Sequence, residues 1–300
     1  MFQEEDVIMK KIIAMTLAAV MCAAALTACG SDAANADVQS TVSETQSAST
    51  EGASTEAQET QAASEESAST EAETADGDNV LIVGTNAEFP PFEYVGDDGE
   101  PDGFDIALIK AIGEKLGMEV QVENMEFNSL IASIGTKIDA VIAGMTVTEE
   151  RAAAVDFSDT YYEAVQSVIV PVDSDIKAAA DLENKTIGVQ LDTTGNFIAD
   201  EIPGATVQAY NKGADAVNDL INGRVDAVII DTNPAQVFAQ QFEGELVALD
   251  GADFDFEAEY YAIALPKGSD LVEKVNQAIA DLKADGTFDA LVAQYIGEVE

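Results

Sequence analysis

The chain lacks the residues that carry most catalytic and metal chemistry. It has no histidine, which removes the commonest general base and the commonest metal ligand. Arginine occurs only at Arg151 and Arg224, so each one requires an explanation. Basic residues number 13 against 57 acidic ones, and the formal charge of −44 repels nucleic acid and anionic lipid head groups. We therefore expect no metal site, no cofactor and no nucleic acid partner.

Cysteine is equally scarce, since Cys22 and Cys29 are the only two. A short basic start, an apolar run and then small residues are typical of a secretion signal, here expected at 1–28 and too short to span a membrane. The stretch "LTAC" at 26–29 resembles a lipobox, which predicts lipidation of Cys29 and a mature domain without a thiol. The alternative is a soluble secreted protein in which this cysteine occurs by chance.

The segment that follows has almost nothing with which to build a core. Residues 31–78 contain no aromatic residue, no leucine, no isoleucine and no basic residue. Such a segment cannot bury enough apolar area to offset its ordering entropy. We expect 29–78 to be a lipidated, disordered, acidic linker. The acidic "MFQEED" before Met9 does not suit a signal sequence, and our hypothesis is that translation begins at Met9.

From residue 79 onward, short apolar β-branched runs alternate with helix-like segments. This alternation predicts an α/β fold with parallel sheets covered by helices. The expected strands are 80–84, 118–122, 138–143, 167–171, 186–190, 205–209, 225–230 and 261–265. The expected helices are 104–116, 127–134, 178–182, 194–200, 213–222, 233–242, 269–284 and 287–296.

One phrase occurs twice. "KIDAVIAG" at 137–144 and "RVDAVIID" at 224–231 each follow an expected amphipathic helix and a turn. Two such copies indicate a duplicated lobe, although the residues "DAVI" alone are common in strands of many proteins. Ligands of open α/β sheets bind beyond the carboxyl ends of strands, where Gly144 and Asp231 stand. We therefore expect both strand ends to face one ligand.

Seven stretches in order resemble the extracellular solute-binding proteins (family 3) of polar amino acid ABC importers. The stretches are "VGTNAEFPPFEY" (83–94), "GFDIALIKAIGEKLG" (103–117), "IDAVIAGMTVTEER" (138–151), "VDFSDTYYE" (155–163), "KTIGVQLDTT" (185–194), "GRVDAVIIDTNPA" (223–235) and "YAIALPKGSDLVEKVNQAIADLKADGTFDALVAQYIG" (261–297). The resemblance covers essentially all of 79–297.

The resemblance implies a periplasmic-binding-protein-like fold of type II (Venus flytrap), with two lobes joined by two hinge strands. The crossings are expected near 167–171 and 261–265. Lobe 1 is then expected at 79–168 with 263–300, and lobe 2 at 169–262. The implied function is a monomeric substrate-binding lipoprotein, anchored outside the cytoplasm through Cys29. It captures a free amino acid between its lobes and delivers it to an ABC permease in the membrane.

A free amino acid carries a carboxylate and an ammonium, and each needs a partner. The guanidinium of Arg151 offers two parallel hydrogen bonds to a carboxylate, and the resemblance implies that role. The alternative is a surface ion pair with Glu149 or Glu150. Asp231 ends a buried strand, so the resemblance implies an ammonium partner, with helix N-capping as the alternative. Arg224 is expected in a solvated turn far from the ligand.

The remaining expected ligand contacts come from a glycine, from threonines before a helix and from two phenylalanines. Gly144 allows close backbone approach, and Thr193 and Thr194 precede a helix whose N–H groups favour a carboxylate or are simply capped. By resemblance, Phe89 and Phe127 enclose the ligand side chain, with ordinary core as the alternative, and Phe92, Tyr161 and Tyr162 belong to core or hinge. The full expected set is Asn86, Phe89, Phe127, Gly144, Met145, Thr146, Arg151, Asp192, Thr193, Thr194 and Asp231.

Two positions depart from the family pattern and bear on specificity. Asn86 stands where many relatives carry aspartate, and Asp192 stands where many carry glycine. The added carboxylate and the acidic surface favour a basic or neutral polar amino acid, unless Asp192 points to water. Two other functions stay open: a ligand sensor or surface lipoprotein without transport, and a lyase or dehydratase on the same fold.

Overall fold

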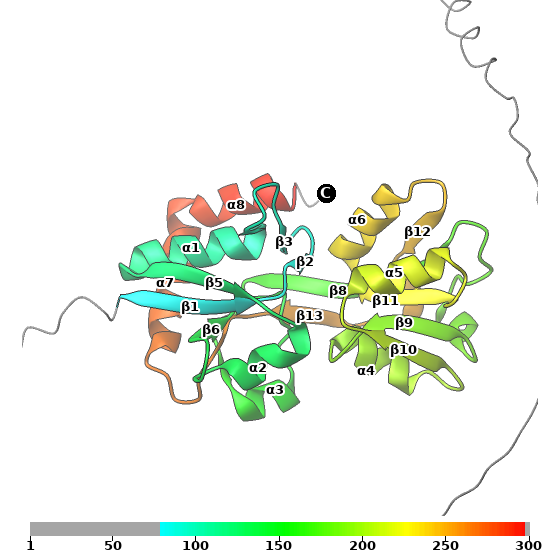
Figure 1. Ribbon diagram of the computed structural model, residues 1–300, viewed down its shortest axis with the longest axis horizontal. Helices are drawn as coiled ribbons and strands as arrows, with labels where there is room; N and C mark the ends of the chain where they lie inside the picture. The colour runs from blue at the N-terminus through cyan, green and yellow to red at the C-terminus, as the bar shows by residue number, and fades with distance from the viewer. Residues whose placement is uncertain (1–78, 298–300) are drawn as a thin grey trace, which may run out of the picture. The chain divides into compact units, whose positions relative to one another are not determined.

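The structure is a computed structural model and describes residues 79–297. The expected signal peptide at 1–28, the linker at 29–78 and the lipidation site at Cys29 lie outside the described residues. Within residues 79–297, no helix is both long and apolar enough to cross a membrane. The described residues form two sheets of mixed direction with helices packed on them (Figure 1).

The first sheet has five strands in the order β5–β1–β6–β14–β7. Its strands are β1 (Val80–Thr85), β5 (Glu119–Asn124), β6 (Ala140–Val141), β7 (Asp156–Phe157) and β14 (Ala264–Leu265). Its helices are α1 (Phe104–Leu116), α2 (Leu130–Ser133), α3 (Glu149–Ala154), α7 (Leu271–Asp285) and α8 (Thr287–Tyr295). Figure 1 shows α1 and α8 on one side of this sheet and α2 and α3 on the other.

The second sheet has the order β10–β9–β11–β8–β12, and β13 also pairs with β8. Its strands are β8 (Tyr162–Pro171), β9 (Thr186–Gln190), β10 (Thr206–Tyr210), β11 (Ala227–Asp231), β12 (Leu246–Leu249) and β13 (Ala258–Tyr261). Its helices are α4 (Thr194–Glu201), α5 (Gly213–Ile221) and α6 (Thr232–Gln241). Strands β8 and β12 run antiparallel to their neighbours, so the expectation of purely parallel sheets is wrong.

A third, small sheet was not expected from the sequence. It consists of β2 (Glu88–Phe89), β3 (Glu93–Val95) and β4 (Pro101–Asp102). Its strands are only two or three residues long, too short for alternation to be read from the sequence. The sheet carries Phe89 and Glu93 to the space between the two lobes.

The two sheets are connected by an antiparallel pair of strands. Residues 162–165 of β8 pair with 258–261 of β13, and the rest of β8 joins the second sheet. The expected crossings at 167–171 and 261–265 therefore lie several residues too late. Around this pair, Phe92 is fully buried and packs edge-on against Tyr162 and Tyr261. This buried aromatic cluster packs against the strand pair and stabilises the connection between the sheets.

The repeated phrase forms the same local structure in both lobes. Asp139 accepts a hydrogen bond from the Ile82 N–H (2.9 Å), and Asp226 accepts one from the Thr186 N–H (2.8 Å). Each aspartate also donates its own N–H to the carbonyl of that partner residue. In each lobe, "DAVI" therefore joins the central strand to its parallel neighbour by the same pair of bonds.

Several expected helices are shorter than the sequence suggested. The segment 127–134 is a 3₁₀ turn (Phe127–Ser129) followed by the single turn of α2, and 178–182 is a 3₁₀ turn (Ala179–Leu182). A further 3₁₀ turn (Gly251–Phe254) precedes β13. Helix α3 was not expected, and it is the element that presents Arg151.

Candidate functional site

A partly open cavity lies between the two lobes. The first lobe contributes the ends of β1 and β6 and the turn before α3, and the second lobe contributes the ends of β9 and β11. The lining residues are Asn86, Phe89, Glu93, Phe127, Ala143, Gly144, Thr146, Arg151, Gln190, Thr193, Thr194 and Asp231.

Arg151 lies at the wall of this cavity and is only 8% exposed. Its guanidinium donates to the Thr146 carbonyl in its own lobe and to the Asp192 carbonyl in the other, both at 2.8 Å. It also lies 5.3 Å from the centre of the Phe127 ring. Among the described residues it forms no ion pair, so the alternative of a surface pair with Glu149 or Glu150 is wrong.

Burial lowers the pKa of Arg151, and the negative charges of Glu259 and Asp231 act in the opposite direction. The guanidinium stays charged because its ordinary pKa is far above neutral. Both direct hydrogen-bond partners of this buried cation are neutral carbonyls, so a hydrogen-bonded anion would stabilise it further. Arg224, by contrast, lies in the turn after α5, as expected, and its side chain is 64% exposed and pairs with Asp219 of that helix.

Asp231 ends β11 and is 8% exposed. It occupies the N-cap position of α6, yet its side chain makes no capping hydrogen bond. Its carboxylate instead accepts a hydrogen bond from the Tyr261 hydroxyl. Burial, and then the charge of Glu259, raises the pKa of Asp231 to about 7. A cation beside this carboxyl group would favour its ionised form.

Gly144 and the ring of Phe89 lie against each other in the wall of the cavity. Its φ angle is +51°, and a Cβ at this position would lie 2.8 Å from the Phe89 ring. Its N–H donates to the carboxylate of Asp105 at 2.7 Å, and so does the hydroxyl of Tyr161. Glycine is therefore required both by the conformation and by the space.

Three threonines line the cavity beside these charges. Thr193 caps α4, accepting from the Asn196 N–H at 3.3 Å, so the capping alternative holds for this residue. Thr194 is the first residue of α4, a position where a backbone N–H has no partner within the helix. Thr146 lies in the turn between β6 and α3. The arrangement places polar groups of both lobes near Arg151.

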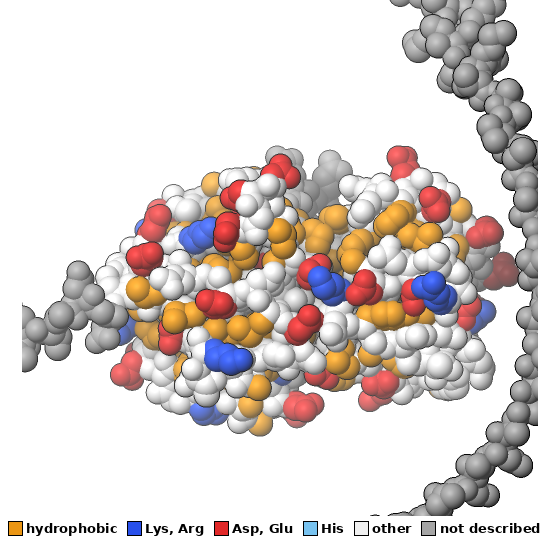
Figure 2. Space-filling model, viewed as in Figure 1, with side chains coloured by type: hydrophobic (Ala, Val, Ile, Leu, Met, Phe, Trp, Pro, Cys, Tyr) orange, Lys and Arg blue, Asp and Glu red, His pale blue; other side chains and the backbone are white. Residues whose placement is uncertain are grey.

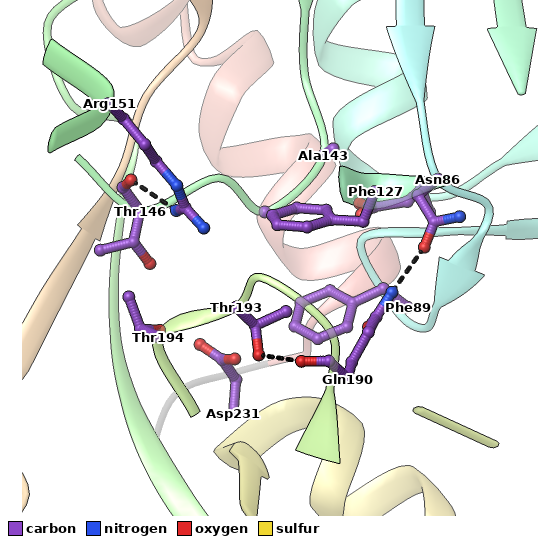
Figure 3. A pocket seen from close by; sticks show the side chains of 12 residues that line it. Asn86, Phe89, Phe127, Ala143, Thr146, Arg151, Gln190, Thr193, Thr194 and Asp231 are labelled. Carbon is purple, nitrogen blue, oxygen red and sulfur yellow. Dashed lines mark hydrogen bonds between the residues drawn. The ribbon is translucent and has the colours of Figure 1, made fainter. Parts of the chain in front are cut away.

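The far end of the cavity is formed by two amides. The Gln190 side chain donates to the Asn86 side-chain oxygen at 2.9 Å, which links the two lobes. Figure 3 shows the rings of Phe89 and Phe127 between this amide pair and the group formed by Arg151 and Thr146. The cavity therefore has a charged end, an aromatic middle and an amide end.

Nine of the eleven residues expected from the sequence line this cavity, and Met145 and Asp192 do not. Met145 is 1% exposed and packs in the core beside β6. Asp192 has an exposed side chain, as the alternative of pointing to water supposed, and a φ angle of +62°. Only its backbone carbonyl approaches the site, where it receives Arg151. The carboxylate of Asp192 therefore does not line the cavity and gives no ground for ligand specificity.

Three further residues line the cavity and were not predicted from the sequence: Glu93, Ala143 and Gln190. Gln190 ends β9 just as Asp231 ends β11, so the rule of strand ends applied to it as well. Ala143 directly precedes Gly144 in the repeated phrase. For Glu93 the sequence gives no signal, because one glutamate among 57 acidic residues does not announce its burial.

Glu93 is 1% exposed, and it lies beside Asp105, which is fully buried. One oxygen of each, Oε2 of Glu93 and Oδ1 of Asp105, has no donor among the described residues. Burial, and then the charge of Asp105, raises the pKa of Glu93 well above its usual range. Burial also raises the pKa of Asp105, to about 6. A proton held by one of the two carboxyl groups would remove the repulsion between their charges.

A family model, the bacterial extracellular solute-binding proteins, family 3, matches residues 81–298. The chain belongs to this family. The fold and family expected from the seven stretches are therefore confirmed. This solute-binding protein is 37% identical to the arginine-binding extracellular protein of Bacillus subtilis (strain 168) over 220 residues, which is 72% of this chain and 85% of that protein.

Two solved structures are also similar to this solute-binding protein. An ancestral arginine-binding protein bound to arginine is 40% identical, with a TM-score of 0.70, and the match covers 73% of this chain and 99% of that one. An ancestral amino acid-binding protein described as a precursor of cyclohexadienyl dehydratase is 35% identical, with a TM-score of 0.67 and coverage of 72% and 95%. The family is extracellular, so the solute-binding protein acts outside the cytoplasm.

Proposed function

We propose that the solute is a free amino acid with a cationic side chain, arginine first, delivered to an ABC importer. The observation that carries this is the charge balance of the cavity. Arg151 is its one cation among the described lining residues, whereas Asp231 and the Glu93–Asp105 pair supply carboxyl groups. A zwitterion leaves this balance unchanged, and an added positive charge improves it. The arginine-binding relatives support the same choice.

The geometry suggests how such a ligand lies in the cavity. Its carboxylate would bind the Arg151 guanidinium and the N–H groups at the start of α4, which favour an anion. Its ammonium would bind Asp231. The side chain would pass between Phe89 and Phe127, whose ring faces attract a cation. Its polar end would reach the oxygens of Asn86 and Gln190.

The acidic surface agrees with a cationic ligand. On the face shown in Figure 2, acidic side chains are spread over both lobes and outnumber the basic ones. A negative field raises the local concentration of a cation and speeds its arrival, most strongly at low ionic strength. The same field slows an acidic amino acid. Affinity itself would still depend on the contacts within the cavity.

Some expectations from the sequence are carried forward as proposals. The lobe limits, 79–168 with 263–300 and 169–262, remain predictions, and the position of the β8–β13 pair favours slightly earlier crossings. The monomeric state and the lipid anchor at Cys29 are likewise proposed. An anchor would keep the protein near its permease at a high effective concentration.

We propose binding without catalysis, although one related structure is described as the precursor of a dehydratase. The chain has no histidine, and both cysteines come before residue 30. The acid–base groups of the cavity are then carboxyl groups whose oxygens bind other residues of the site. Recovery of altered product after incubation with candidate acids would contradict this proposal.

The test is a thermal-shift screen against the twenty amino acids, repeated with two arginine variants. A ligand that binds only the folded protein raises the melting temperature. We expect the largest shift with arginine, its loss in Arg151→Ala, and its full retention in Arg224→Ala. Arg224 is the matched control because it is the chain's other arginine and lies in an exposed turn. A full arginine shift in Arg151→Ala would refute the carboxylate role.

A further inference from the structure

One carboxylate from the connection between the sheets touches both lobes at once. Oε2 of Glu259, on β13, accepts from the Thr146 hydroxyl and from the Thr194 hydroxyl, each at 2.7 Å. Thr146 belongs to the first lobe, and Thr194 opens α4 in the second. Both threonines line the cavity. A rotation of one lobe away from the other would break at least one of these two bonds.

The position of Glu259 follows from strand geometry. Side chains two residues apart on a strand point to the same face, so Glu259 shares a face with Tyr261. Tyr261 is fully buried and donates to Asp231, whereas Tyr260, between them, is 45% exposed. The inner face of β13 therefore provides one donor and one acceptor to the site, at the strand about which the lobes would move.

The charge of Glu259 is not neutralised by a basic side chain among the described residues. The negative charge of Glu259 helps to raise the pKa of Asp231. It also raises the pKa of Arg151, which burial lowers. Placing two carboxylates near each other is unfavourable unless other contacts compensate. The two threonine hydroxyls provide that compensation, and hydrogen bonds to a charged acceptor are the strong ones.

We propose that Glu259 is a positioning residue that latches the two lobes together around a bound solute. This inference rests on the proposed function, because it concerns closure over the same cavity. Each threonine hydroxyl has one proton, and both protons are committed to Glu259. Neither hydroxyl then donates to a ligand carboxylate, which relies on Arg151 and backbone N–H groups. The latch forms on closure, so it slows the release of solute and leaves its capture unchanged.

The experiment measures association and dissociation rates for arginine on the full chain by stopped flow. We expect Glu259→Ala to raise the dissociation rate at least tenfold with the association rate within twofold of wild type. Glu259→Gln keeps an acceptor without charge and should give a smaller increase. Glu257→Gln is the matched control, since it removes the same charge from an exposed position two residues away and should change neither rate.

A coupling test separates the latch from a general loss of stability. Thr194→Val removes one of the two donors and should raise the dissociation rate in the wild type. It should add nothing in the Glu259→Ala background, because contacts that act together are not additive. A dissociation rate in Glu259→Ala equal to that of Glu257→Gln, or full additivity with Thr194→Val, overturns the latch. Failure of the wild-type chain to bind any amino acid refutes the proposed function instead.

Discussion

The titration of Asp231 gives the sharpest quantitative prediction. Burial and the charge of Glu259 raise its pKa to about 7, from an ordinary value of 3.8. An ammonium ion held against the carboxylate favours the ionised form and lowers the pKa again. Ligand binding should then release a proton near neutral pH, and acidification should weaken binding.

The size of the effect follows from the two pKa values. A shift of roughly three units corresponds to about 4 kcal/mol between the protonation states. Below pH 7, affinity should fall by up to roughly tenfold for each pH unit, until the pKa of the bound form is reached. Between pH 7.5 and pH 5.0 the expected loss is therefore on the order of 100-fold.

Isothermal titration calorimetry with arginine measures both parts of this prediction. The dissociation constant is determined at pH 5.0, 6.0 and 7.5, and buffers with different ionisation enthalpies report the protons released. In Asp231→Asn the affinity should be low and nearly independent of pH, because the amide does not titrate. Wild-type affinities within twofold of each other at pH 5.0 and pH 7.5 would refute the reasoning.

Two further predictions concern stability. Glu93→Gln should lose less unfolding free energy between pH 5 and pH 8 than the wild type, by about 1.4 kcal/mol per unit of raised pKa. The sign follows because a raised folded-state pKa lets the unfolded chain release its proton first, so stability falls as pH rises from about 4. Equal losses in urea unfolding of both proteins would contradict it. Gly251→Ala should cost about 1–3 kcal/mol or more, because its Cβ would lie 2.0 Å from the Gln166 carbonyl oxygen. Urea unfolding checks this as well, with the exposed neighbour Ala252→Ser as control, and a loss no larger than the control's would show that the contact relaxes freely.

The sequence predicts well the strands that lie inside one sheet along their whole length. Strands β1, β9 and β11 lie within two residues of their expected limits. The last residues of the two copies of the repeated phrase, Gly144 and Asp231, both line the cavity. There, apolar runs are short, bounded by turns and buried on both faces. Pattern and burial then agree, so periodicity is sufficient.

The connection between the lobes is where pattern and burial disagree. The apolar run at 261–265 is continuous in sequence, yet β13 ends at Tyr261 and β14 begins at Ala264 in the other sheet. Strand β8 already begins at Tyr162, and its paired residues include Glu163 and Gln166, although both are polar. Hydrophobicity cannot reveal that the two halves of β8 pair with different strands. Glu259 was missed for the same reason.

The partners of Arg151 and Asp231 explain why this cavity suits a zwitterion. Both side chains are buried and line the same cavity, yet the described residues contain no ion pair between them. Arg151 is held by two carbonyls and Asp231 by a tyrosine hydroxyl, all of them neutral. A direct pair would satisfy both charges and leave nothing for a ligand to gain. Holding each charge with neutral partners fixes its position and keeps its compensation for a molecule that carries the opposite charge at each end.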